Sequence, residues 1–168
     1  MNTERNEREF ALYTSYNVEK LTETFNARAD RLCTFLLILL GSAVLADIFN
    51  TTVVGLIVTS LAAIQFVYRF GEAAGNARTQ KLRYASLLDH KHSLEDKELA
   101  DRLDRIHEHD SRPLASVEAI AFNKACLMRG QEAEMAPLSV AARIVALLAG
   151  GYPCEPEAPK NKTPDTTE

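Results

Sequence analysis

Residues 32–68 read LCTFLLILLGSAVLADIFNTTVVGLIVTSLAAIQFVY, and this stretch decides the fold. It contains two apolar runs, 32–49 and 51–68, in which Asp47 is the only charged residue. Each run has 18 residues, which gives a helix of about 27 Å, close to the roughly 30 Å hydrocarbon core of a bilayer. The stretch therefore predicts an all-α fold built on a two-transmembrane helical hairpin.

Basic residues surround the base of this predicted hairpin. No Lys or Arg lies near the turn at Asn50, whereas seven flank the outer ends of the two runs: Lys20, Arg28, Arg31, Arg69, Arg78, Lys81 and Arg83. This positive-inside pattern predicts a multi-pass protein of a bacterial inner membrane with both termini in the cytoplasm. The alternative is a soluble protein that buries the hairpin in its core. The charge asymmetry and the uninterrupted apolar character favour the membrane.

The composition along the chain divides it into four segments. We expect an N-terminal cytosolic amphipathic helix at 1–31, the transmembrane hairpin at 32–68, a cytosolic helical region at 69–150 and a disordered tail at 151–168. Apolar residues recur at helical spacing in the first segment without Pro or Gly, so its helix should continue into the first span. The tail is rich in Pro, Glu, Lys and Thr, a composition that cannot bury a core.

Punctuating residues predict the layout of the cytosolic region. The sequence Ser-Leu-Glu-Asp from Ser93 resembles a capping box, which predicts a new helix starting there. Whether the helix before it is continuous or folds back at this point stays open. The remaining signals are a bend at Gly71 and Gly75, a helix over 114–128 that stops at Gly130, and a helix over 138–149 that Pro137 opens.

Leu99, Leu103 and Ile106 form an apolar stripe at helical spacing. Alternating acidic and basic residues surround the stripe, as on a coiled-coil helix that pairs with another helix. The pairing helix can belong to the same chain, to a second copy or to a partner. The stripe is therefore the candidate surface for a partner or an oligomer.

Within the apolar runs, small and polar residues are the candidates for a pore or for helix packing. Gln65 is the most polar side chain of the second run, and intramembrane polar groups tend to face a bundle interior or a water path. Small residues allow helices to approach closely. The candidate set is Gln65, Ser60, Gly55, Ser42 and Ala46. These small and polar residues predict either a homo-oligomer or ordinary packing of the hairpin on itself.

The rest of the sequence lacks the patterns of catalysis and of cofactor or metal binding. The net charge of −4 and the pI near 5.6 argue against nucleic acid as the main partner. There is no glycine-rich phosphate loop, nucleophile elbow or H-E-x-x-H motif. The two pairs His90/His92 and His107/His109 would be separated by about 20 Å along a helix, so we expect structural or solvated histidines. We predict a protein that is not an enzyme and has no cofactor and no bound metal.

Four short segments resemble the bacterial SLATT proteins, which are two-transmembrane effectors associated with nucleotide-signalling defence systems. The likeness covers roughly residues 10–130, and the segments are AIQFVYRF (63–70), RYASLL (83–88), RIHEHDSRP (105–113) and AFN (121–123). The resemblance implies an antiviral membrane effector that oligomerises and perturbs or permeabilises the inner membrane when a cytosolic sensor protein is triggered. The family supplies no catalytic residues.

Two functions are compatible with the sequence. The first is an oligomerising, pore-forming membrane effector that acts on lipid, with Gln65 as its pore-facing group and a sensor as its partner. The second is a membrane-anchored scaffold that recruits a cytosolic protein through the stripe of Leu99, Leu103 and Ile106.

Overall fold

The computed structural model describes residues 3–45, 50–150 and 154, with the backbone alone at 44 and 45. These residues form α-helices and two short 3₁₀ turns, and the described part of the chain contains no strand. The all-α class is confirmed. The predicted tail at 151–168 lies outside the described residues, apart from Cys154, and so do Ala46 and Asp47.

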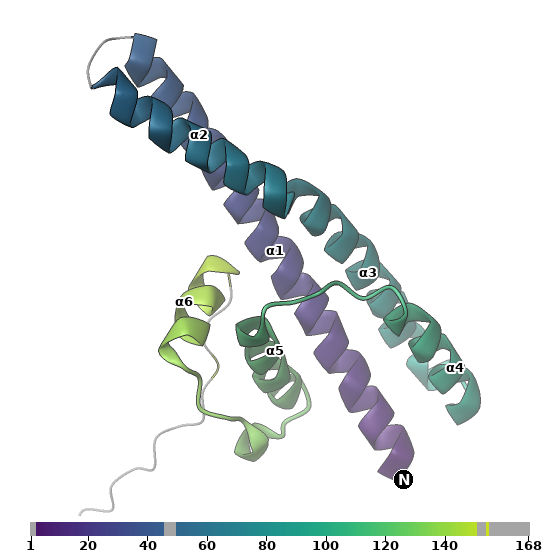
Figure 1. The fold of residues 1–168 in the computed structure, drawn as a ribbon. Coiled ribbons are helices and arrows are strands. Elements are labelled where there is room, and N and C mark those ends of the chain that lie inside the picture. The colour runs from purple at the N-terminus through teal and green to yellow at the C-terminus, as the bar shows by residue number, and fades with distance from the viewer. Residues whose placement is uncertain (1–2, 46–49, 151–153, 155–168) are drawn as a thin grey trace, which may run out of the picture.

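A single helix, α1 (Thr3–Leu45), organises the whole molecule (Figure 1). At 43 residues it extends for about 65 Å. The helix passes through the predicted boundary at residue 31 without a break, as the uninterrupted pattern of its first segment predicted. The amphipathic segment and residues 32–45 of the first apolar run therefore form one continuous helix.

Helix α2 (Thr51–Tyr68) runs antiparallel along the C-terminal part of α1 (Figure 1). Asn50 caps its start, since its side chain accepts hydrogen bonds from the amides of Thr52 and Val53. In the described part of the chain, α2 belongs to the one helical stretch long and apolar enough to cross a bilayer, with a window of mean hydropathy 1.8 that is 6% buried. Residues 46–49 of the first apolar run lie outside that part.

Helix α3 (Phe70–His90) follows α2 after a bend at Arg69. Arg69 adopts the left-handed conformation, with φ 47° and ψ 47°, and donates its amide to the carbonyl of Gln65. The prediction of a bend at Gly71 and Gly75 was wrong, because both glycines lie inside α3. A residue in the left-handed conformation can end a helix whether it is glycine or arginine. For arginine this conformation costs about 1 kcal/mol.

A 3₁₀ turn (Lys91–Ser93) separates α3 from α4 (Asp96–His107), which folds back beside it. The capping box predicted at Ser93 was wrong. The Ser93 hydroxyl donates to the carbonyl of His90 at 2.8 Å and so closes the 3₁₀ turn. Leu94 and Glu95 are extended, and α4 begins after Glu95 without a side-chain cap. The hydroxyl was satisfied by the end of one helix and was not free for the next.

The C-terminal part contains α5 (Ala115–Met128), a 3₁₀ turn (Glu132–Glu134) and α6 (Val140–Leu148). Helix α5 matches its predicted range, and Gly130 follows it with φ +68°. Helix α6 starts two residues later than predicted, because the N-cap is Ser139, whose hydroxyl accepts the amide of Ala142 at 3.1 Å. Pro137 lies outside the helix.

Two apolar clusters cover the N-terminal part of α1. The first joins α1 to α5 and α6 and contains Leu21, Val117, Ile120, Ala121, Leu138, Ala142, Ala146 and Ala149. The second joins α1 to α3 and α4 and contains Leu12, Tyr84, Leu87, Leu99 and Leu103. We call this part of the molecule, residues 3–30 with α3 to α6, the helical body. The apolar hairpin of residues 32–45 and α2 extends beyond it (Figure 1).

Candidate functional site

The apolar hairpin exposes most of its hydrophobic side chains. Val54 is the one residue of α2 that is buried. Leu56 is 70% exposed and Phe66 is 83% exposed. The other large exposed side chains of the hairpin are Leu32, Phe35, Ile38, Leu39, Val53, Ile57, Ile64, Val67 and Tyr68. No other part of the described chain covers these faces.

The small residues of the hairpin face open space. A Cβ added at Gly41 or Gly55 would meet nothing within 4 Å. The hydroxyls of Ser42 and Ser60 each donate to a carbonyl four residues earlier in their own helix, at 2.9 and 2.8 Å. These residues therefore do not pack the hairpin on itself. Ala46, the fifth member of the predicted set, lies outside the described residues.

Gln65 faces α1 of the same chain. Its amide nitrogen lies 3.3 Å from Asp30 Oδ1 and 3.2 Å from Thr34 Oγ1, and it donates a hydrogen bond to each. A Cβ added at Gly71 would lie 3.5 Å from the same Asp30 oxygen, so α3 also approaches closely here. Gln65 thus joins the two helices at the base of the hairpin. Sequence reasoning selected Gln65 but missed Asp30, because only the pairing of the helices shows its role.

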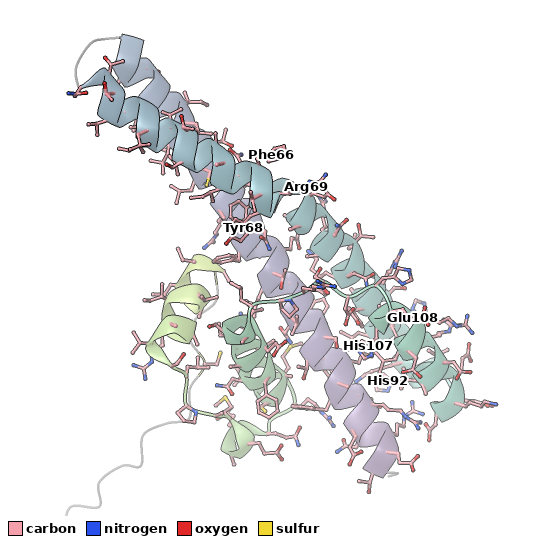
Figure 2. The ribbon with its side chains drawn as sticks, viewed as in Figure 1. Phe66, Tyr68, Arg69, His92, His107 and Glu108 are labelled. Carbon is pink, nitrogen blue, oxygen red and sulfur yellow. The ribbon has the colours of Figure 1, made fainter. Side chains whose placement is uncertain are left out.

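Aromatic and basic side chains gather at the junction of α2 and α3. Figure 2 shows Phe66, Tyr68 and Arg69 there, next to the apolar hairpin. The rings of Tyr68 and Phe70 stack at a centroid distance of 5.5 Å, and Arg69 forms an ion pair with Glu72. Aromatic residues with adjacent cations are typical of the boundary between a membrane and water.

The stripe on α4 lies in the helical body. Leu99 is fully buried, Leu103 is 4% exposed, and Ile106 packs beside them against α1 and α3. The pairing helices thus belong to the same chain, one of the alternatives that the sequence left open. The stripe is not the surface that the scaffold hypothesis requires.

A groove of about 930 Å³ lies just below the hairpin. Phe25, Tyr68 and Phe70 line it on the side of the hairpin, and Arg83 lines it from α3. The segment 109–114, which leads from α4 to α5 and crosses α1 in Figure 1, lines its other side. No motif predicted this groove, because its walls come from parts of the chain that are distant in sequence.

Polar side chains connect α1, α3 and the end of α4 next to the groove. Asp110 Oδ1 accepts hydrogen bonds from the hydroxyl of Tyr84 at 2.5 Å and from the amide of Gln80 at 3.3 Å. Burial, and then the Asp110 carboxylate, raise the pKa of Tyr84. The buried carboxyl of Glu19 accepts the amide of Ser111 at 2.8 Å. Burial also raises the pKa of Glu19, with a smaller contribution from Asp110.

The histidines lie in different environments. His107 Nε2 is 3.0 Å from the hydroxyl of Ser15, and His90 Nδ1 is 2.8 Å from the carbonyl of Ser86. His92 and His109 are exposed; Figure 2 labels His92 and His107 near α4. Among the described residues, no three His, Cys, Asp or Glu side chains come together as a metal site.

Comparisons with protein-family models, with curated proteins and with solved structures give no match to this chain.

Proposed function

We propose that the hairpin of residues 32–68 is inserted in a bacterial inner membrane, with both termini in the cytoplasm, and that the protein acts on this membrane as an oligomerising effector. The observation that carries the proposal is the exposure of α2, an apolar helix of 18 residues with a single buried residue. Large uncovered apolar surfaces are rare on soluble proteins.

The surroundings of the hairpin support insertion. A soluble protein would cover such a helix, since burying apolar surface gives about 25 cal/mol for each Å². Here the helical body covers α1 only up to the hairpin. At the boundary lie the Gln65–Asp30 contact, the Tyr68–Phe70 pair and Arg69. Polar and aromatic groups at this level match a headgroup region, and the basic residues near it match the cytoplasmic side.

The free faces of the hairpin favour self-association over an isolated anchor. A Cβ added at Gly41 or Gly55 meets no atom of the described chain within 4 Å, so these faces are accessible to lipid or to a second hairpin. Small residues let transmembrane helices approach closely. The resemblance of residues 10–130 to the SLATT proteins points the same way. In this proposal a cytosolic sensor protein provides the trigger, and assembled hairpins permeabilise the membrane.

A membrane-anchored scaffold is the second candidate. With the α4 stripe buried, this function needs another docking surface. The outer side of α6 offers one, because Val140 is 72% exposed, Ile144 54% and Leu147 63%. Charged substitution at Ile144 should then release a co-purifying protein without changing membrane insertion.

Insertion and topology can be tested with one cysteine. We expect Asn50→Cys to react with a membrane-impermeant maleimide added outside intact spheroplasts, because Asn50 lies at the hairpin tip. The wild-type chain is the control: Cys126 is buried, Cys33 lies in the first apolar run and Cys154 belongs to the cytoplasmic side. Recovery of the protein in the soluble fraction, or labelling of Asn50→Cys only after lysis, would contradict insertion in this orientation.

Effector action can be tested at Gly55. Leucine fits there in the isolated chain, because the added side chain starts in open space. We expect overexpression of the wild type to give cross-linked oligomers and to depolarise the membrane, and we expect Gly55→Leu to remain inserted but to lose both effects. Val53→Leu is the matched control, since Val53 is exposed on the same helix. Wild-type expression without depolarisation, or equal behaviour of both variants, would count against the effector.

A further inference from the structure

The segment from Glu108 to Leu114 is held against α1 by one buried carboxyl group. Glu19 is 1% exposed, and its Oε1 accepts the backbone amide of Ser111 at 2.8 Å. Its second oxygen, Oε2, is buried without a hydrogen-bond partner. The hydroxyl of Thr22, one turn along α1, is also buried and unpartnered. Buried polar atoms are rarely left without a partner, and a proton on the Glu19 carboxyl would provide a donor at this place.

Burial makes the negative charge of Glu19 unfavourable and raises its pKa, an effect that outweighs the amide and the hydroxyl of Ser111, which favour the charge. Asp110, in the same segment, is fixed by Tyr84 and Gln80 of α3 and raises the pKa of Glu19 in addition to burial. Tyr84 is neutral at physiological pH, since its own pKa is raised.

The remaining titratable groups near Glu19 are engaged elsewhere. His107 of α4 contacts Ser15 and the ring of Tyr84. Glu23, one turn along α1, is paired with Lys81. From the segment itself, His109 and Arg112 line the groove. No cation of the described chain forms an ion pair with Glu19.

We propose that Glu19 is a proton-operated latch that ties the segment 108–114 to α1 and thereby sets the opening of the groove at the base of the hairpin. When Glu19 is protonated, one of its oxygens still accepts a hydrogen bond from the Ser111 amide. The protonated oxygen can donate a hydrogen bond to a neighbouring acceptor. When Glu19 is ionised, its charge is buried with one oxygen unpartnered, the nearby Asp110 carboxylate adds a smaller repulsion, and the segment is released. Ser111, Arg112 and Leu114 line the groove opposite Tyr68 and Phe70, so release widens it next to the hairpin.

The direction of the pH effect follows from linkage. The pKa of Glu19 is raised above 4.5 in the latched state and returns toward that value when the segment is released. The latch is therefore fully stabilised below about pH 4.5 and weakens as the pH rises through the raised pKa. Across this pH range, the equilibrium constant for closing the latch falls about tenfold for each unit by which latching raises the pKa of Glu19. The inference depends on the helical body and is independent of whether the hairpin forms a pore.

Hydrogen exchange of the full-length protein in detergent micelles tests the latch. We expect the protection of amides in 108–114, corrected for the intrinsic pH dependence of exchange, to be several-fold higher at pH 5 than at pH 8. In Glu19→Gln, a neutral side chain of the same shape, protection should be high at both pH values. Protection that does not depend on pH in the wild type, or a pH dependence that persists in Glu19→Gln, overturns the proposal.

Two further variants keep the test decisive. Glu23→Gln is the matched control, because Glu23 lies one turn away on α1 and is paired with Lys81 of α3, so the pH dependence should remain. Asp110→Asn removes the opposing charge and should reduce the difference between pH 5 and pH 8 even if Glu19→Gln folds poorly. If Asp110→Asn leaves this difference unchanged while His107→Gln abolishes it, the titrating group is the histidine and the latch is refuted.

Discussion

The two ends of α1 place the same helix in opposite environments. From Thr3 to Asp30, its apolar side chains are covered by α3, α4, α5 and α6, and Leu12 and Leu21 are buried. From Leu32 onward it runs beside α2 in the part of the chain that the structure describes, and Phe35 and Ile38 are exposed. The change occurs within a few residues of Asp30. A continuous helix thus connects a conventional core to a surface whose covering, in our proposal, is lipid.

Burial within the chain and hydrophobicity are therefore separate properties in this protein. The most apolar part of the protein is the least buried, whereas the more polar body has two complete cores. Equivalent substitutions in the two regions should therefore change the free energy of unfolding by different amounts. The difference between these amounts measures how independent the two regions are.

The largest difference is expected for truncated leucines. Leu99→Ala removes a fully buried side chain of the body and should lower the free energy of unfolding by about 2–5 kcal/mol. Leu56→Ala, at a position 70% exposed on the hairpin, should change it by less than about 0.5 kcal/mol. Denaturant titration in mild detergent, followed by circular dichroism, measures both. Equal losses would mean that the hairpin contributes to the same core.

Buried polar groups come next. Asn123 is fully buried, donates to the carbonyls of Ala136 and Cys154, and accepts the amide of Ala136 at 2.9 Å. Asn123→Ala should cost about 1–3 kcal/mol, because it leaves these groups unpaired. Gln65→Ala, which removes the contact with Asp30 and Thr34, should cost about 1 kcal/mol or less. The same denaturant titration measures both losses in the free energy of unfolding. A larger loss for Gln65→Ala than for Asn123→Ala would show that the base of the hairpin stabilises the helical body.

A pair of glycines sharpens the comparison further. Gly150 has φ +70°, and an added Cβ would lie 2.7 Å from Arg28 Nη2, so Gly150→Ala should cost about 1 kcal/mol. Arg28 itself donates to the carbonyls of Leu147 and Leu148 at the end of α6. Gly41→Ala, within α1 and facing open space, should be neutral or slightly stabilising. Thermal unfolding of the two variants gives the test, and a destabilised Gly41→Ala would indicate a close neighbour on the hairpin.

The smallest effect is expected from pH. The raised pKa of Glu19 makes its contribution to the stability of the body fall as the pH rises above about 4.5. The pKa of Glu9, on the same helix, is shifted in the opposite direction. Burial would raise its pKa, but hydrogen bonds and ion pairs with Lys91 and Arg5 lower it overall, so its contribution is lost as the pH falls. Glu19→Gln should therefore flatten the neutral side of the pH–stability profile, and Glu9→Gln the acidic side. Identical profiles for both variants would contradict these assignments.

Much of the local structure could be predicted from the sequence. Helix α5 follows from periodicity, and the continuation of α1 past residue 31 follows from the periodicity and the absence of Pro and Gly in its first segment. The wrong predictions concern the ends of helices, where one residue could cap or bend either of two adjacent elements. Ser93 caps the turn behind it instead of the helix ahead, and Arg69 forms the bend assigned to Gly71 and Gly75. Such choices depend on which helix ends meet in space, and a sequence pattern does not contain that information.

The candidate site divides in the same way. Gln65 could be selected from its polarity in an apolar run, but its partner Asp30 could not, because their separation in sequence says nothing about register. The stripe of Leu99, Leu103 and Ile106 was recognised as a packing surface, and only the fold showed that α1 and α3 cover it.

By itself, the sequence determined the helical class, the place of the two apolar runs and the asymmetry of charge around them, because length, periodicity and charge are local properties. Only the tertiary structure shows which helices cover the first part of α1, that the apolar stripe of α4 is buried, and that Glu19 meets the segment after α4. These depend on contacts between distant residues, where burial, hydrogen bonding and charge act together.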